Sequence, residues 1–252
     1  MKITLCQTDI VWGSPEANCE QLDRMLAGLG KTDLVLLPEM FSTGFATIPD
    51  GIAETSPAPT LEWMKRKASE ADCAVAGSLS VKDSGKYYNR FYFVKPDGTA
   101  EFYDKRHLFT YGGEQLRYSA GKERKVVEWR GARFLLSVCY DLRFPCALRN
   151  IGDYDLLLCV ASWPSERRYA WDTLLRARAI ENQCYVAAVN RTGDDPICSY
   201  NGGSVLLDPR GGDIARCSDG NAEMLTAEAD LNALRGFRES FPVLDDRDPV
   251  SL

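Results

Sequence analysis

LLSVCYDLRFP, residues 135–145, sets the organisation of this chain. Its first half is an apolar run that predicts a buried strand, and Cys139 follows at the strand's end. Pro145 suits the first turn of a helix, which we expect over residues 145–151. A thiol at such a strand-to-helix turn faces helix-start amides, and α/β proteins place their chemistry there. The plain alternative is a buried structural cysteine, because the chain has 9 cysteines.

Two other predicted strands also lead to charged side chains. Residues 33–37 end before Glu39, and residues 99–104 end before Lys105. A free thiol has a pKa of about 8.5, and a nearby ammonium lowers that pKa and favours the thiolate. A carboxylate within reach can take the thiol proton and later deliver it to a leaving amine. The three side chains therefore supply a nucleophile, a cation and a base without a histidine.

The segments that carry these side chains resemble the Glu–Lys–Cys motifs of the nitrilase, or carbon–nitrogen hydrolase, superfamily. They are LLPEMF (36–41), YDKRHLF (103–109) and CYDLRFP (139–145). Together with ARAIENQ (177–183), they are most similar to bacterial omega-amidases of the YafV type. The likeness runs nearly end to end, and three motifs in order are far more specific than one.

The resemblance assigns a role to each residue. Cys139 is expected to be the nucleophile, and Glu39 the general base and then the general acid. Lys105 and the backbone N–H of Tyr140 are expected to stabilise the tetrahedral oxyanion. Glu114, nine residues after Lys105, matches a second glutamate that orients the lysine. The alternative for Glu114 is a solvated loop acid.

Substrate contacts are expected from four side chains near these motifs. Arg143 is about one helical turn beyond the nucleophile and can clamp a substrate carboxylate through a bidentate pair. Its alternative is a salt bridge to Asp141 or Asp155. The other three residues are aromatic and can wall the pocket, although aromatic side chains pack equally well in a core: Phe41, Tyr111 and Trp163.

Composition narrows the remaining possibilities. A length of 252 residues fits one domain over 1–252, with an extended tail over about 238–252. The net charge of −6 argues against a nucleic-acid surface, and no apolar run is long enough to cross a membrane. The N-terminus lacks a signal-peptide pattern, so we expect a cytoplasmic protein. His107 is the only histidine, which speaks against a zinc site or a Cys–His dyad, and no metal or cofactor is expected.

Alternating strands and helices, with a hairpin inserted in each half, predict an α/β fold of two stacked sheets flanked by helices. The resemblance implies the same architecture, an α-β-β-α sandwich with mixed sheets. We expect helices over 14–29, where Gly30 would stop the first, over 60–71 and over 167–182. The expected strands are 2–6, 33–37, 73–79, 87–94, 99–104, 133–138, 156–160, 184–190, 204–207, 213–217 and 223–229.

The resulting functional hypothesis is an amidase that forms a cysteine thioester. The resemblance implies 2-oxoglutaramate or 2-oxosuccinamate as the substrate, and a homodimer built on the helices near 145–151 and 167–182. One alternative is another branch of the superfamily, which hydrolyses nitriles, carbamoyl amides or deaminated glutathione. Another is a catalytically silent binding protein, which the presence of all three motif residues disfavours.

Overall fold

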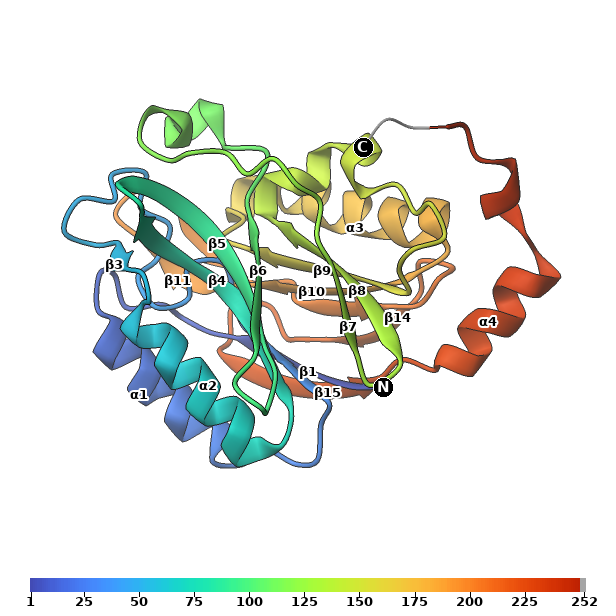
Figure 1. Cartoon of the computed structure of the whole chain (residues 1–252), viewed down its shortest axis with the longest axis horizontal. Coiled ribbons are helices and arrows are strands. Elements are labelled where there is room, and N and C mark those ends of the chain that lie inside the picture. The colour runs from blue at the N-terminus through green and yellow to red at the C-terminus, as the bar shows by residue number, and fades with distance from the viewer. Residues whose placement is uncertain (250–252) are drawn as a thin grey trace.

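Two β-sheets packed face to face form the centre of the computed structural model, which describes residues 1–249 (Figure 1). The first sheet has the strand order β15-β1-β2-β4-β5-β6, and the two-residue strand β3 pairs with β4. Its strands are β1 (Lys2–Gln7), β2 (Leu34–Leu36), β3 (Glu54–Thr55), β4 (Ala74–Asp83), β5 (Lys86–Val94), β6 (Ala100–Asp104) and β15 (Glu223–Glu228).

The second sheet has the order β14-β13-β10-β9-β8-β7, and a separate two-stranded hairpin, β11-β12, follows β10. The strands of these two units are β7 (Val126–Trp129), β8 (Ala132–Val138), β9 (Leu156–Ala161), β10 (Tyr185–Asn190), β11 (Thr192–Asp194), β12 (Ser199–Asn201), β13 (Val205–Leu207) and β14 (Asp213–Arg216). Both sheets are mixed, as expected, because parallel strands at their centres are flanked by antiparallel ones.

Helices cover the outer face of each sheet. Figure 1 shows α1 and α2 on one side of the sandwich and α3 on the other. The α-helices are α1 (Pro15–Leu26), α2 (Pro59–Ala71), α3 (Arg168–Asn182) and α4 (Leu231–Ser240). The described residues also contain six short 3₁₀ helices: η1 (Thr110–Gly112), η2 (Glu114–Leu116), η3 (Cys139–Arg143), η4 (Pro145–Leu148), η5 (Ser165–Arg167) and η6 (Val243–Asp246). None of the helices in residues 1–249 is long and apolar enough to cross a membrane.

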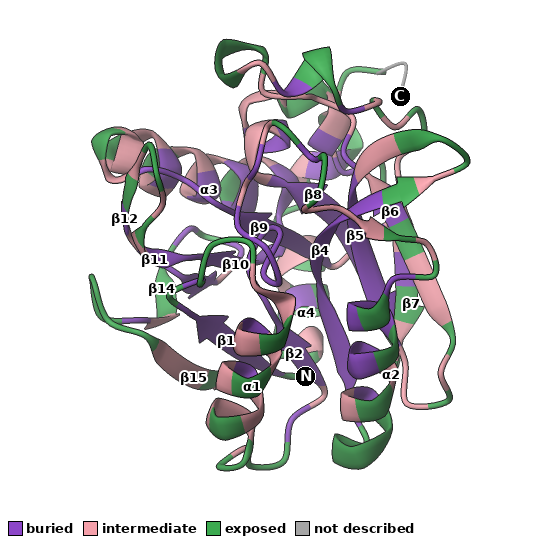
Figure 2. Ribbon diagram, turned by 90° about the vertical axis from the view of Figure 1, so that its left-hand side faces the viewer, coloured by how far each residue is buried: buried purple, intermediate pink, exposed green. Residues whose placement is uncertain are grey.

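Three hydrophobic cores hold these four layers together. The central core lies between the sheets, where the rings of Phe93 from β5 and Phe134 from β8 are 5.5 Å apart. An outer core joins the first sheet to α1 and α2, and another joins the second sheet to α3. β8 is therefore buried on both faces, which explains its unbroken apolar sequence. In Figure 2 the central strands of both sheets are buried, whereas the edge strands β6, β7, β14 and β15 are partly exposed. The expected α-β-β-α sandwich is confirmed.

Three expectations about the elements were wrong. The helix expected over 145–151 is only the short 3₁₀ helix η4, which ends at Leu148. Another 3₁₀ helix, η3, precedes it, and the two are separate because Pro145 disfavours helical backbone at Phe144. The first helix ends at Leu26, before Gly28, so Leu29 is outside it. The chain after residue 238 is not simply extended, since α4 continues to Ser240 and η6 follows. Residues 250–252 of that tail lie outside the described residues.

Candidate active site

Cys139 is placed at the carboxyl end of β8, where it begins η3 with a φ of +47°. Positive φ at a residue other than glycine is strained by about 1–3 kcal/mol and needs support from the surroundings. Asp141 gives that support, because its Oδ2 accepts a hydrogen bond from the N–H of Val138 at 3.0 Å. The buried carboxylate thereby closes the turn that presents the thiol.

Asp141 is itself held by three further donors. Its oxygens accept hydrogen bonds from the Tyr103 hydroxyl at 2.8 Å and from the His107 backbone N–H at 3.0 Å, and Oδ1 is 2.8 Å from His107 Nδ1. The imidazole of His107 stacks on Phe144, with ring centroids 4.0 Å apart. The only histidine thus supports the turn around the nucleophile.

Lys105 lies between two buried carboxylates. Its Nζ donates to Glu39 Oε1 at 3.0 Å and to Glu114 Oε2 at 3.0 Å, and all three side chains are fully shielded from solvent. The ring of Phe45 covers the ammonium at 5.1 Å. Buried charges require partners of this kind, so the three residues form one unit. Glu114 is therefore not the solvated loop acid that was its alternative.

The second carboxylate oxygen of Glu39 faces the other sheet. Oε2 accepts a hydrogen bond from the N–H of Ser162 at 2.8 Å, just after β9, and Ser162 O is 4.0 Å from Cys139 Sγ. β8 and β9 are parallel neighbours, so their carboxyl ends place Cys139 and Ser162 side by side. The first sheet supplies the carboxylates and the lysine, and the second supplies the thiol.

The pKa values of these groups are moved strongly by burial. Burial raises the pKa of the Cys139 thiol well above its ordinary value, Glu39 raises it further, and Lys105 only partly opposes the two. The lowered thiol pKa expected from the sequence is therefore wrong for the free protein. Burial alone would lower the pKa of Lys105, but Glu114 and Glu39 outweigh it and hold that pKa well above the usual range. The resting site accordingly contains a neutral thiol beside a permanently charged lysine.

A pocket of about 100 Å³ opens over Cys139. Arg143 and Arg167 both line it, with their guanidinium carbons 4.8 Å from the ring centroid of Trp163 and 5.5 Å from that of Phe109, respectively. Neither guanidinium has a hydrogen-bond or ion-pair partner among residues 1–249. The pocket thus combines aromatic walls with two available cations, which suits a small anionic ligand.

A family model for carbon-nitrogen hydrolases matches residues 2–239. This chain is a carbon–nitrogen hydrolase. It is 47% identical to omega-amidase YafV of Yersinia enterocolitica, over 100% of this chain and 98% of that protein. It is 36% identical to 2-oxoglutaramate amidase of Bacillus subtilis, over 97% of this chain and 96% of that protein. A solved CN-hydrolase superfamily protein of Xanthomonas campestris, with an arsenic adduct in its active site, is 42% identical and superposes with a TM-score of 0.97, covering 100% and 98% of the two chains.

The pocket of this carbon–nitrogen hydrolase contains two of the four residues expected to contact substrate, Arg143 and Trp163. The expectation for Phe41 was wrong, because its ring is buried in the outer core and packs on Trp63. The expectation for Tyr111 was also wrong, since it is 87% exposed on η1 and does not line the pocket. Phe45, four residues after Phe41, takes the expected place over the site.

Other parts of the hydrolase site gave no signal in the sequence. Asn89 lies in the middle of β5, Ser162 contributes through its backbone, and Arg167 is one of many surface-type arginines. The hairpin β11-β12 closes one side of the pocket through Asp195, Ile197 and Tyr200. No cluster of three or more His, Cys, Asp or Glu side chains within residues 1–249 has the arrangement of a metal site.

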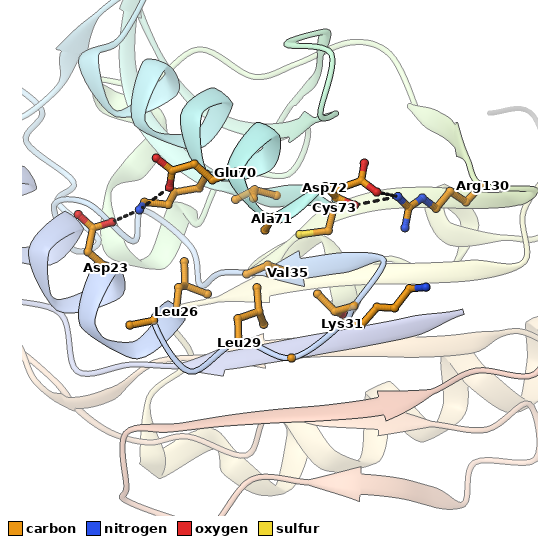
Figure 3. Close-up of a pocket in the computed structure, with 15 residues that line it drawn as sticks. Asp23, Leu26, Leu29, Lys31, Val35, Glu70, Ala71, Asp72, Cys73 and Arg130 are labelled. Carbon is orange, nitrogen blue, oxygen red and sulfur yellow. Dashed lines mark hydrogen bonds and ion pairs between the residues drawn. The ribbon is translucent and has the colours of Figure 1, made fainter.

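A larger hollow, of about 570 Å³, lies far from this chemistry between the C-terminal ends of α1 and α2 (Figure 3). Two of its three cations are already neutralised: Lys67 pairs with Asp23 and Glu70, and Arg130 pairs with Asp33 and Asp72. The third, Lys31, has no ion-pair partner among residues 1–249 (Figure 3). Cys73 at its floor is buried, which raises the pKa of its thiol to about 11. The hollow therefore offers no activated nucleophile.

Proposed function

We propose that this hydrolase is an omega-amidase, which releases ammonia from the terminal amide of 2-oxoglutaramate or 2-oxosuccinamate through a thioester on Cys139. The observation that carries the proposal is the buried Glu39–Lys105–Glu114 unit beside Cys139, in a pocket with two unpaired arginines. Full-length relatives named omega-amidase and 2-oxoglutaramate amidase support the choice of substrate.

Because burial raises the pKa of the Cys139 thiol, Glu39 must take its proton for the sulfur to act as a strong nucleophile. As Sγ attacks the amide carbon, Glu39 takes the thiol proton, and the carbonyl oxygen becomes an oxyanion. Lys105 has a third N–H to offer the oxyanion, and the N–H of Tyr140 lies in the first turn of η3, where amides lack intrahelical partners. Both donors are preorganised for charge that appears only in the transition state.

Glu39 then acts as a general acid and gives up the proton that it took from the thiol. Its proton passes to the amide nitrogen, the carbon–nitrogen bond breaks, and ammonia leaves a thioester on Cys139. Water attacks the thioester while Glu39 accepts one of its protons, and collapse of the second tetrahedral intermediate releases the acid. The Cys139 thiolate regains its proton from Glu39. Lys105 stays charged throughout, because its two carboxylate partners hold its pKa above the usual range.

The distal carboxylate of such a substrate needs a cation that is not part of the chemistry. Lys105 is occupied by Glu39 and Glu114, whereas Arg143 and Arg167 line the same pocket without partners in the described chain. Among residues 1–249, Asp195 is the only acidic residue that lines the pocket. It already accepts hydrogen bonds from the Tyr200 hydroxyl and from the amides of Ile197 and Cys198, so it is turned toward its own hairpin. The pocket thus favours substrates with a negative end.

The test is to trap the covalent intermediate. Protein quenched during turnover of 2-oxoglutaramate should carry an acyl adduct on the peptide that contains Cys139, and ammonia should be released. Cys139→Ala should reduce kcat by about four orders of magnitude or more, because members of a catalytic unit are lost together. The exposed Cys146 is the matched control, and Cys146→Ala should remain active. An adduct on Cys146, or full activity in Cys139→Ala, would contradict the proposal.

A further inference from the structure

Asn89 is a buried amide that contacts both carboxylates of the site. Its side-chain nitrogen donates to Glu39 Oε1 at 2.7 Å and to Glu114 Oε1 at 3.3 Å. An amide nitrogen carries two hydrogens, so one can point at each carboxylate. Asn89 is 1% exposed and lies inside β5, away from the strand ends that carry the other residues.

The same residue also fixes the lysine. The backbone N–H of Lys105 donates to the backbone carbonyl of Asn89 at 2.9 Å, which extends the pairing of β5 with β6. Asn89 therefore sets the position of Lys105 through its main chain, and the positions of the two lysine partners through its side chain. All three contacts come from one rigid strand, and this is the arrangement that accurate sites require.

The orientation of the Asn89 side-chain amide leaves its oxygen without a hydrogen-bond partner but directs its nitrogen toward the two carboxylates. Asn89 Oδ1 is buried and has no hydrogen-bond partner in the described structure. Leaving a buried acceptor unpaired destabilises a fold, and buried amides are usually satisfied at both ends. Here the nitrogen must face the carboxylates, because turning the amide over would place its oxygen against two negatively charged groups. The hydrogen bonds from the amide nitrogen to the carboxylates thus outweigh the missing hydrogen bond at Oδ1.

We propose that Asn89 is a positioning residue, which holds Glu39 and Glu114 on either side of Lys105. The proposal rests on the proposed roles of Glu39, Lys105 and Cys139. Two carboxylates share one ammonium in this unit, so one negative charge is left over next to the thiol. The amide hydrogens of Asn89 supply partial positive charge where the two carboxylates approach each other. The remaining titratable groups around the cluster are Cys139 and the Tyr118 hydroxyl, whose pKa is raised by burial.

Asn89→Asp separates this role from a merely structural one. The variant keeps the shape of the side chain but replaces the two amide hydrogens with a third negative charge. We expect kcat/KM to fall by about 100-fold or more, since a like charge disfavours ionisation of its neighbours. The acid limb of the pH profile of kcat/KM should move to higher pH, because the substitution removes a donor from the cluster and adds a third negative charge to it. Iodoacetamide labelling of Cys139 should likewise require higher pH.

Asn89→Ala provides a second measurement if the aspartate variant does not fold. It removes one hydrogen bond to each carboxylate, so kcat/KM should fall by about 10- to 100-fold with a smaller move of the acid limb in the same direction. KM for substrate should change little, because Asn89 does not line the pocket.

Asn150 is the matched control. It is equally buried and donates to the carbonyls of Tyr154 and Asn182, outside the site. Asn150→Asp should lower the melting temperature without moving the pH profile. Folded Asn89 variants with an unchanged pH profile, while Cys139 still carries the acyl adduct, would overturn the role of Asn89 alone. Absence of that adduct in the unmodified protein would instead contradict the proposed function.

Discussion

The Cys139 thiol lies in surroundings that keep its proton on sulfur until substrate arrives. Burial and Glu39 both raise its pKa, and Lys105 lowers it only in part. A neutral thiol is a weak nucleophile but is also poorly reactive toward oxidants. Glu39 must therefore remove this proton for the sulfur to become a strong nucleophile. Glu39 and Lys105 act on the thiol in different ways, so their contributions can be measured separately.

Glu39→Gln and Lys105→Ala should differ in their kinetics. Glu39→Gln keeps the shape of the base but cannot accept a proton, so kcat should fall by about 10²–10⁴-fold while substrate still binds. Lys105→Ala removes the one cation that lowers the thiol pKa, so the pH profile of iodoacetamide labelling should move to higher pH. Labelling of each variant across a pH series measures this, with Lys122→Ala as a surface control. An unchanged profile in Lys105→Ala would place the lysine outside the reaction.

Arg143→Ala should distinguish substrates by their charge. Loss of a desolvated ion pair with the substrate carboxylate should reduce kcat/KM for 2-oxoglutaramate by about 30-fold or more, and Arg167 in the same pocket should keep the loss at the lower end of the usual range. A neutral amide of similar length should lose less than about threefold by the same reasoning. Equal losses on both substrates would mean that Arg143 only supports Trp163.

The sequence predicts those site residues that follow the ends of strands. Glu39, Lys105 and Cys139 are polar side chains directly after apolar runs, and this pattern is visible without a structure. Phe41 and Phe45 cannot be separated in this way, because only the path of the loop decides which ring is turned to the core. Asn89 is concealed for a different reason, since a polar residue inside a strand is usually assigned to the solvent-facing side.

At the scale of elements, the turn from β8 into η3 is the part on which the chemistry depends most. Its conformation could not be predicted from the local sequence, which favours a helix after Pro145. The turn is stabilised instead by contacts with a distant segment, residues 103–107, that supplies three of the four donors to Asp141. Tertiary contacts therefore override local propensity at the nucleophile.

Asp141→Asn tests the importance of this turn. The asparagine side chain has one acceptor and would place a donor against the donors that converge on this position, so we expect kcat to fall by about 10- to 100-fold and the melting temperature to decrease. The rate at which iodoacetamide labels Cys139 should change as well, because the thiol is no longer fixed. Asp153→Asn, which breaks an ion pair with Arg124 outside the site, should lower stability only. Unchanged labelling in a folded Asp141→Asn protein would contradict this role.

At the scale of the whole molecule, the predicted architecture follows from the alternation of apolar strands and amphipathic helices. The pairing of sheets across the central core could not be read from any single segment, since it depends on contacts such as Phe93 with Phe134. We propose that the protein assembles as a homodimer. The interface would be built on α3 and on η4 with the residues after it, where Tyr169, Ile180 and Ile151 are exposed apolar side chains.

Light scattering measures this directly. At micromolar concentration the protein should have twice the chain mass of 28.1 kDa. Tyr169→Glu should shift the mass toward that of one chain, because a charge in an apolar interface is unfavourable. Tyr111→Glu is the control, since Tyr111 is equally exposed but lies on η1. A single-chain mass for the unmodified protein would refute the dimer.

The division of the site between two sheets has a consequence for how the protein acquires its activity. The carboxylates and the lysine come from the sheet that contains both β1 and β15, and those two strands pair over their whole length from opposite ends of the chain. That sheet is complete only when residues 223–228 have been synthesised and have returned to the N-terminus. Assembly of the complete active site is thus expected only after nearly the whole chain has been synthesised.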